Sequence, residues 1–186
     1  SFFPPSASFL SFGGGVIYLI VTKSHLITEP EYLEILDKDL AHIQISVTCL
    51  DDDRAFSYEK ASPPSKRIQS ILKLQDLGFD VSIRLSPLIP DFFDFDKLAS
   101  LKIEKGIIEF LRINAWIKKW LFNVDFSKYT LRQGGYSHLP LDEKMRIHSK
   151  IKIPCITVCE DVTEHYLYWR DHFNPNPLDC CNLRVL

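Results

Sequence analysis

The sequence has 186 residues and a mass of 21.6 kDa, which suits one domain of ordinary size and is too little for two. Hydrophobic residues make up 46% and charged residues 25%, a composition that excludes an intrinsically disordered or collagen-like chain. The 22 basic and 24 acidic residues give a net charge of −2, so no overall basic field attracts nucleic acid or anionic membranes. A local basic groove is compatible with this balance.

The cysteines and the first residues indicate the compartment. Five cysteines are an odd number, and the adjacent pair Cys180 and Cys181 does not suit the disulfide framework of a secreted protein, so we expect a cytoplasmic protein. Residues 1–22 carry no charge, but prolines and glycines interrupt them and the apolar run 16–21 is far shorter than the ~20 residues of a membrane span. We expect a strand there and no membrane partner. Because the chain begins with Ser, we expect a processed or truncated product.

Along the chain, β-rich apolar runs alternate with amphipathic helical patterns, which is typical of βα units and a parallel sheet. Start and stop signals support the helices: Ser62 and Pro63 open one that Gly78 ends, and Asp161 and Glu164 have capping-box spacing. The predicted strands are 16–23, 42–48, 79–85, 107–113 and 153–159. The predicted helices are 30–40, 63–77, 94–102, 141–151 and 161–173. We expect a single domain over 1–186, with an irregular N-terminal segment 1–15, a body 16–173 and a cysteine-containing tail 174–186.

The faces of two strands help to choose between a partial (β/α) barrel and an open doubly wound sheet. Side chains alternate along a strand, so 42–48 has polar Gln44, Ser46 and Thr48 on one face and apolar residues on the other. In 79–85 and the next residue the polar set is Ser82, Arg84 and Ser86. A strand between two helix layers should be apolar on both faces, whereas a barrel lumen that holds a polar ligand accepts a polar face. We therefore predict an α/β fold, a partial (β/α) barrel of five or six units, with the open sheet as the alternative.

Both architectures gather ligands at the carboxyl ends of their parallel strands. Lys23 and Arg84 would make a corner that binds a carboxylate or a phosphate, because Arg offers a planar fork and Lys a mobile ammonium. The alternative is that each cation pairs with a local acid such as Asp51, Asp52 or Glu59. The full set at the predicted strand ends is Lys23, Ser24, Thr48, Cys49, Arg84, Ser86, Asn114, Cys159 and Glu160.

Four segments carry a resemblance to a known family. They are Val21-Thr-Lys23-Ser24, Ile45-Ser46-Val47-Thr48 with Leu50-Asp51-Asp52, Ala61-Ser62-Pro63-Pro64 with Arg67, and Val81-Ser-Ile-Arg84-Leu-Ser86-Pro87-Leu-Ile-Pro90. In order and spacing, over about 16–113, they resemble the radical SAM superfamily and its spore photoproduct lyase-like branch, which is related to DNA repair photolyases.

The resemblance implies a partial (β/α) barrel in which a [4Fe-4S] cluster binds S-adenosylmethionine and cleaves it reductively to a 5′-deoxyadenosyl radical. It also implies an electron donor and a nucleic-acid substrate. In such proteins a strand-end Lys, a Ser on the next strand and an Arg on the one after hold the methionyl part of the cofactor. These positions are Lys23, Ser46 and Arg84 here, within the polar corner found from the strand ends.

The sequence departs from the family in its cysteines. The family binds its cluster through a C-x3-C-x2-C loop after the first strand, and no cysteine precedes Cys49. Cys155 and Cys159 repeat the first interval, but they fall on a predicted strand and the third position is Val162. Cys180 and Cys181, with Cys159 nearby, are better candidates for a second metal or redox site, since thiolates suit iron–sulfur and zinc centres. The alternative for all of them is a structural or free thiol.

Two further stretches permit two interpretations each. Trp116-Ile-Lys118-Lys119-Trp120 could stack on bases and neutralise phosphates, but an amphipathic helix with inward tryptophans and solvated lysines is the favoured interpretation. The acidic run 51–53 lacks the ligand spacing of a calcium loop and indicates a solvated loop and helix start.

These observations favour a radical SAM enzyme, seen without its cluster loop, that starts radical chemistry on a nucleic-acid base. The rival is a non-catalytic barrel that has lost the cluster and binds a nucleotide or protein partner. In either case we expect the 186 residues alone to be inactive in cleaving S-adenosylmethionine.

Overall fold

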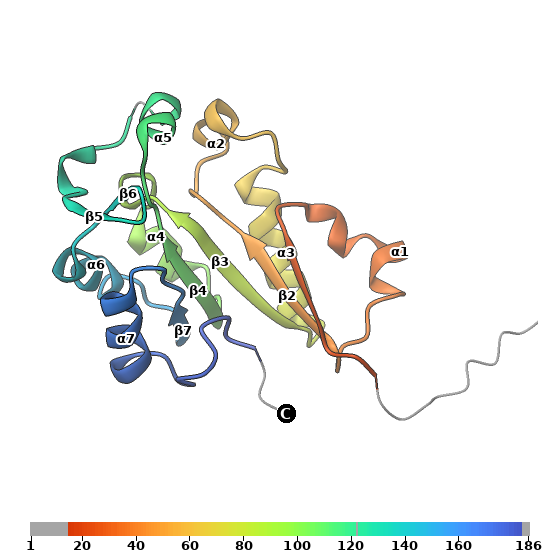
Figure 1. Cartoon of the computed structure of the whole chain (residues 1–186). Coiled ribbons are helices and arrows are strands. Elements are labelled where there is room, and N and C mark those ends of the chain that lie inside the picture. The colour runs from red at the N-terminus through yellow and green to blue at the C-terminus, as the bar shows by residue number, and fades with distance from the viewer. Residues whose placement is uncertain (1–14, 122, 184–186) are drawn as a thin grey trace, which may run out of the picture.

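A computed structural model describes residues 15–121 and 123–183 of the chain. Its main sheet has five strands in the order β1-β2-β3-β4-β7, and every neighbouring pair is parallel (Figure 1). These strands are β1 (Tyr18–Thr22), β2 (Ala41–Ser46), β3 (Asp80–Leu88), β4 (Lys105–Phe110) and β7 (Cys155–Val158). The short strands β5 (Leu131–Gln133) and β6 (Tyr136–His138) form a separate antiparallel hairpin.

The strand order distinguishes the two predicted architectures. A doubly wound sheet reverses direction at a switch point, whereas here each strand of the main sheet lies beside its predecessor in that sheet. Right-handed crossovers that always advance in one direction place their helices on one face of the sheet. The predicted parallel sheet and partial barrel are therefore confirmed.

Seven α-helices and three 3-10 turns connect the strands in the described part of the chain. The α-helices are α1 (Pro30–Leu33), α2 (Asp52–Tyr58), α3 (Pro64–Asp76), α4 (Phe95–Ser100), α5 (Ala115–Trp120), α6 (Leu141–His148) and α7 (Thr163–His172). The 3-10 turns are η1 (His25–Thr28), η2 (Pro90–Phe92) and η3 (Phe126–Lys128). None of these helices combines the length and the apolar character needed to cross a membrane.

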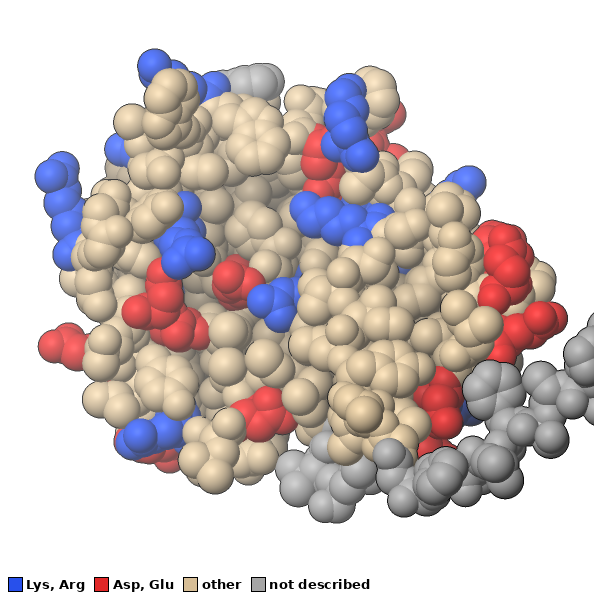
Figure 2. All heavy atoms as spheres, turned by 45° about the vertical axis from the view of Figure 1, so that its right-hand side comes forward, with Lys and Arg blue, Asp and Glu red and all other residues tan. Residues whose placement is uncertain are grey.

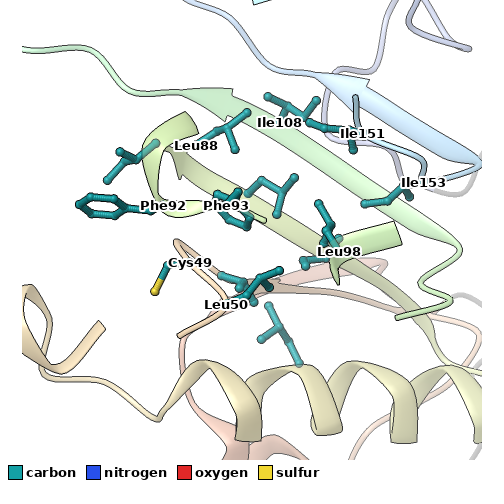
Figure 3. Packing of buried hydrophobic residues seen from close by; sticks show 14 of the residues in the cluster. Cys49, Leu50, Leu88, Phe92, Phe93, Leu98, Ile108, Ile151 and Ile153 are labelled. Carbon is teal, nitrogen blue, oxygen red and sulfur yellow. The ribbon is translucent and has the colours of Figure 1, made fainter. Parts of the chain in front are cut away.

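The hydrophobic core lies between the apolar face of the sheet and the helices. Ile45 and Ile83, on neighbouring strands, are fully buried, as are Ile71 and Leu74 of α3. Figure 3 shows this packing around α4 and the end of β3, where Leu88, Phe93 and Leu98 converge. The opposite, polar face of the sheet is left for other contacts.

Local hydrogen bonds explain where elements differ from their predicted limits. The helix predicted over 30–40 ends at Leu33, because the Asp37 carboxylate accepts the Asp39 amide at 2.9 Å in a local turn that competes with helix. The acidic run 51–53 starts α2, with Asp51 capping the Arg54 amide at 2.7 Å.

Two predicted caps are wrong. The Ser62 hydroxyl contacts His25 and does not cap α3, whose N-cap is Pro63. Asp161 pairs with Arg112, and α7 begins after Val162 without a side-chain cap. Gly78 does end α3, with a φ of 80° that favours glycine.

Candidate functional site

The polar face of the sheet is organised in rows across the strands. The register places Ser46 beside Arg84, Arg84 beside Ile107, and Ile107 beside Thr157. Parallel neighbours point to the same face, so this row runs from β2 to β7 on the side away from the core helices. Ser46 and Thr157 are buried, so the polar face is covered at both ends of this row.

Arg84 is the centre of one hydrogen-bonded group on this face. Its Nη1 donates to Gln44 Oε1 and its Nη2 donates to Glu109 Oε2, both at 2.7 Å. The Ser86 hydroxyl donates to the same Glu109 oxygen at 2.7 Å. The Arg84 side chain is 17% exposed, so its guanidinium needs the anionic partner that Glu109 provides. The predicted residues Arg84 and Ser86 thus both donate to the carboxylate of Glu109, which was not among the predicted site residues.

Lys23 belongs to a second group at the ends of β1 and β2. Its Nζ donates to Glu59 Oε2 at 2.6 Å, and the other oxygen of Glu59 receives the guanidinium of Arg67. Arg67 is fully buried and also donates to the carbonyl oxygen of Ser46 at 2.8 Å. Burial alone would raise the pKa of Glu59, but hydrogen bonds from Arg67 and Lys23 outweigh it and hold that pKa below its ordinary value.

The three predicted cofactor residues therefore lie along one edge but not on one common carboxylate. Ser46 is next to Arg84 in the ladder, and Arg67 links the Ser46 backbone to Glu59 and so to Lys23. For Lys23 the alternative of a local acid, Glu59, is confirmed, whereas Arg84 pairs with Glu109 instead.

Other members of the predicted rim have structural roles. Cys49 is fully buried in the core, and its thiol donates to the Asp51 carbonyl. Ser24 caps η1, and Asn114 caps α5 through bonds to two backbone amides. The Thr48 hydroxyl lies 2.6 Å from the Tyr58 hydroxyl beside Glu59, so it supports the Lys23 group.

The tail crosses the polar face of the sheet and covers it. Gln44 Nε2 donates to the Cys181 carbonyl at 2.8 Å, and the Thr157 hydroxyl donates to the Cys180 carbonyl at 2.9 Å. The Asn182 amide nitrogen donates to the carbonyls of Gly106 and Cys155. In Figure 1 the tail reaches the sheet from α7 near the amino ends of the strands. It therefore forms a floor under the Arg84 group and reaches the carboxyl end of β7 at Cys159.

The tail places Cys180 beside Cys159, with 3.6 Å between their sulfur atoms.

The residues that could hold a metal ion lie elsewhere. Among residues 15–121 and 123–183, three potential metal ligands come together: His138, Glu160 and Asp161. Their ligand atoms all lie within 4.8 Å of one another. Glu160 is paired with Lys144 and Asp161 with Arg112, so these carboxylates are already neutralised. Cys159, Cys180 and Cys181 do not form such a group.

A buried charged cluster at the end of β7 escaped the sequence reasoning. Lys144 of α6 is 1% exposed, and its Nζ binds Glu160 and lies 3.1 Å from His165 Nδ1. Burial lowers the pKa of Lys144 despite Glu160, and burial followed by the charge of Lys144 lowers the pKa of His165 to about 4. In the sequence, Glu160 has a signal in its position after a strand and His165 in its i,i+4 spacing from Asp161, whereas Lys144 has none.

The rim above the carboxyl ends carries an aromatic and basic surface. Trp116 is 76% exposed and Trp120 is 55% exposed, so the prediction of inward tryptophans is wrong. Beside them, a cavity of about 510 Å³ lies between α5 and the β5–β6 hairpin. Its lining includes Lys118 and Arg132 but no acidic residue, and neither cation forms an ion pair within the described residues. The Gly134-Gly135 turn that builds the hairpin was the overlooked signal.

Figure 2 shows basic and acidic side chains adjacent to one another across one face, without a broad area of one sign. Recognition by this protein therefore depends on local groups, since the net charge is −2.

Comparison with solved structures supports the architecture. Spore photoproduct lyase complexed with dinucleoside spore photoproduct aligns with 75% of this chain and 49% of the lyase chain, at a TM-score of 0.50 and 12% identity. A point variant of spore photoproduct lyase aligns with the same coverage, at a TM-score of 0.50 and 13% identity. The chain has a radical SAM-like fold. At this level of identity the likeness shows the fold alone.

Sequence comparison adds one relative. The chain is 32% identical over 77 residues to the uncharacterized protein ORF301 of Acidianus two-tailed virus, a match that covers 41% of this chain and 26% of ORF301. No protein-family model matches the sequence. The chain thus spans about a quarter of the viral relative and about half of the lyase chains.

Proposed function

We propose that this chain is the cofactor-binding part of a radical SAM enzyme that acts on a nucleic-acid base. The observation that carries the proposal is the Arg84–Glu109 pair, which lies on the polar face of a partial barrel, above the floor made by the tail. The radical SAM-like fold and the family segments that contain Lys23, Ser46 and Arg84 support it.

The chemistry of this pair fits the methionyl part of S-adenosylmethionine. That part is a zwitterion. Its carboxylate can pair with a guanidinium of the protein, and its ammonium can pair with a carboxylate of the protein. Arg84 Nη1 and Nη2 offer a fork for the carboxylate, while Glu109 Oε2 accepts from an ammonium. Glu109 is 35% exposed, so an incoming ligand can reach it without unfolding the sheet.

Lys23 and Ser46 extend the same edge. The Lys23 side chain is 38% exposed and can turn from Glu59 to a ligand carboxylate, since Arg67 remains to neutralise Glu59. The hydroxyl of Ser46 lies on the polar face in the row of Arg84. When bound with its iron–sulfur cluster, S-adenosylmethionine supplies the initiating radical. The cysteines of the sequence do not fit the family's cluster loop, so we assign the cluster ligands to polypeptide outside these 186 residues.

The rim of α5 and the hairpin suits a nucleic-acid substrate. Exposed aromatic rings stack on unpaired bases, and unpaired cations attract phosphates. Trp116 and Trp120 offer the rings, and Lys118 and Arg132 offer the charges, close to the carboxyl ends where the cofactor edge lies. One structural neighbour, spore photoproduct lyase, is complexed with a dinucleoside photoproduct, which agrees with a substrate of this class.

Calorimetric titration with S-adenosylmethionine of the protein that carries the iron–sulfur cluster tests the proposal. Arg84→Ala should weaken binding by about 2–5 kcal/mol, because it removes a partly buried partner of the ligand carboxylate. Arg112→Ala is the matched control, since it removes a more exposed arginine of the rim that also pairs with a carboxylate, Asp161.

Two results would contradict the proposal. If Arg84→Ala and the parent bind equally, Arg84 belongs to a structural ion pair. If the protein assembles no cluster and binds a nucleotide but not S-adenosylmethionine, the rival non-catalytic barrel is favoured.

A further inference from the structure

Cys180 is held against Cys159 by contacts of its own backbone and of the two residues that follow it. The carbonyl of Cys180 accepts the Thr157 hydroxyl, and the next carbonyl, that of Cys181, accepts Gln44 Nε2. The next residue, Asn182, is fixed by two hydrogen bonds from its side-chain amide to backbone carbonyls, at 3.0 and 3.1 Å. The sulfur of Cys180 therefore stays 3.6 Å from that of Cys159, which is on the neighbouring end of β7.

The other cysteines are committed to different contacts. The Cys155 thiol faces the Asn182 amide oxygen at 3.5 Å, and Cys49 lies in the core with its thiol on a backbone carbonyl. A bond between adjacent Cys180 and Cys181 would need a strained ring around a planar peptide, and the Cys181 backbone is held by Asp179 and Gln44. Geometry thus selects the Cys159 and Cys180 pair.

We propose that Cys159 and Cys180 form a reversible disulfide that fastens the tail to the sheet when the protein meets a low-molecular-weight disulfide. The two thiols give two electrons and two protons, and the oxidant is reduced to two thiols. Exchange passes through a mixed disulfide on one cysteine, which the other then displaces. This inference does not depend on the proposed radical SAM function.

The environment indicates the order of the steps. Burial, followed by the neighbouring Cys180, raises the pKa of Cys159 to about 12. Cys159 is therefore a poor initiating nucleophile, and we assign it the second step, the intramolecular attack on the mixed disulfide at Cys180. The low thiolate fraction of Cys159 slows this step too, but the attack is intramolecular and joins sulfur atoms that already lie 3.6 Å apart.

Incubation of the folded chain in glutathione buffers of increasing oxidised fraction, followed by alkylation and intact mass, tests the disulfide. The number of free thiols should fall by two from five, without added glutathione mass, and excess dithiothreitol should restore it. Trypsin releases Cys155 and Cys159 on one peptide and Cys180 and Cys181 on another, so the oxidised sample should contain one cross-linked peptide pair.

Single variants assign the sulfurs. Cys155→Ser and Cys181→Ser should keep the cross-link, whereas Cys159→Ser and Cys180→Ser should lose it. Cys159→Ser should retain glutathione on Cys180, and Cys180→Ser should gain little glutathione on Cys159. Circular dichroism confirms that each variant is folded. A cross-link that survives in Cys159→Ser, or five reactive thiols in the folded oxidised parent, would overturn the proposal. Zinc that copurifies with the parent and is lost in both of these variants would replace it with a metal site.

Discussion

At the scale of single residues, buried charges are tolerated where each has a partner from another segment. Glu59 pairs with both Arg67 and Lys23, Glu109 pairs with Arg84, and Glu160 pairs with Lys144. Removing one partner of such a pair leaves an uncompensated charge, which costs far more than a surface ion pair contributes. A cation can turn to a ligand only if its acid keeps another partner or the ligand replaces that acid. Arg67 cannot turn to a ligand, because it is fully buried.

His165 gives the protein a predicted dependence of stability on pH. Its folded pKa is about 4 against an ordinary value of 6.5, so the folded protein binds this proton less readily than the unfolded chain does. The stabilisation is fully present above pH 6.5 and should be lost progressively as the pH falls to about 4, by on the order of 2 kcal/mol. His165→Asn, which keeps an acceptor for Lys144, should flatten the profile of unfolding free energy across this range.

Urea unfolding between pH 4 and 7.5 provides the measurement. His172→Asn, at the exposed end of α7, is the control and should follow the parent profile. A His165→Asn profile as steep as that of the parent would show that other groups cause the loss.

At the scale of elements, the sequence predicted those with strong local signals. The strands of the main sheet and α3 have long apolar patterns and clear breakers such as Gly78, and they form close to their predicted limits. The hairpin and α2 are too short for periodicity to reveal. The tail could not be predicted as a floor, because the bond of Gln44 to Cys181 joins residues 137 positions apart. No local pattern encodes such a contact.

Asn182 should be the residue that secures the tail. Its amide donates to two carbonyls, and its φ of 55° is unfavourable for most side chains. Asn182→Gly removes the hydrogen bonds but keeps the conformation, so it should cost about 1–3 kcal/mol of unfolding free energy. Asn182→Ala should cost more, since it adds backbone strain. Thermal or urea unfolding measures both, and equal stability of all three proteins would show that the tail does not support the sheet.

At the scale of the whole molecule, the partial barrel separates two surfaces. The tail covers the polar face toward the amino ends of the strands and touches the carboxyl end of β7 at Cys159, and the carboxyl ends of the other strands open toward α2, α5 and the hairpin (Figure 1). The row of Ser46 and Arg84 could be predicted from strand alternation, because side-chain direction in a strand has a period of two. The same alternation places Glu109 on this face, two residues after Ile107 of β4, but does not predict its pairing with Arg84. Glu59 could not be predicted at all, because it reaches the site from the end of α2.

For the proposed binding of nucleic acid, we expect the rim of α5 and the hairpin to supply the contacts, since the net charge is −2 and the cavity there is lined by Lys118 and Arg132 without an acidic residue. Each phosphate neutralised on a single strand contributes about 0.7 to the slope of log affinity against log salt concentration. The double variant Lys118→Gln with Arg132→Gln should therefore weaken binding of a fluorescent single-stranded oligonucleotide and reduce that slope by about 1.4. Trp116→Ala should weaken binding by about 1–3 kcal/mol without changing the slope, because it removes a stacking surface and no charge.

Lys66→Gln on the exposed face of α3 is the control for charge alone. Fluorescence anisotropy at several salt concentrations measures affinity and slope together. If the control and the double variant lose affinity equally, binding reflects diffuse charge, and the cavity between α5 and the hairpin is not the nucleic-acid site.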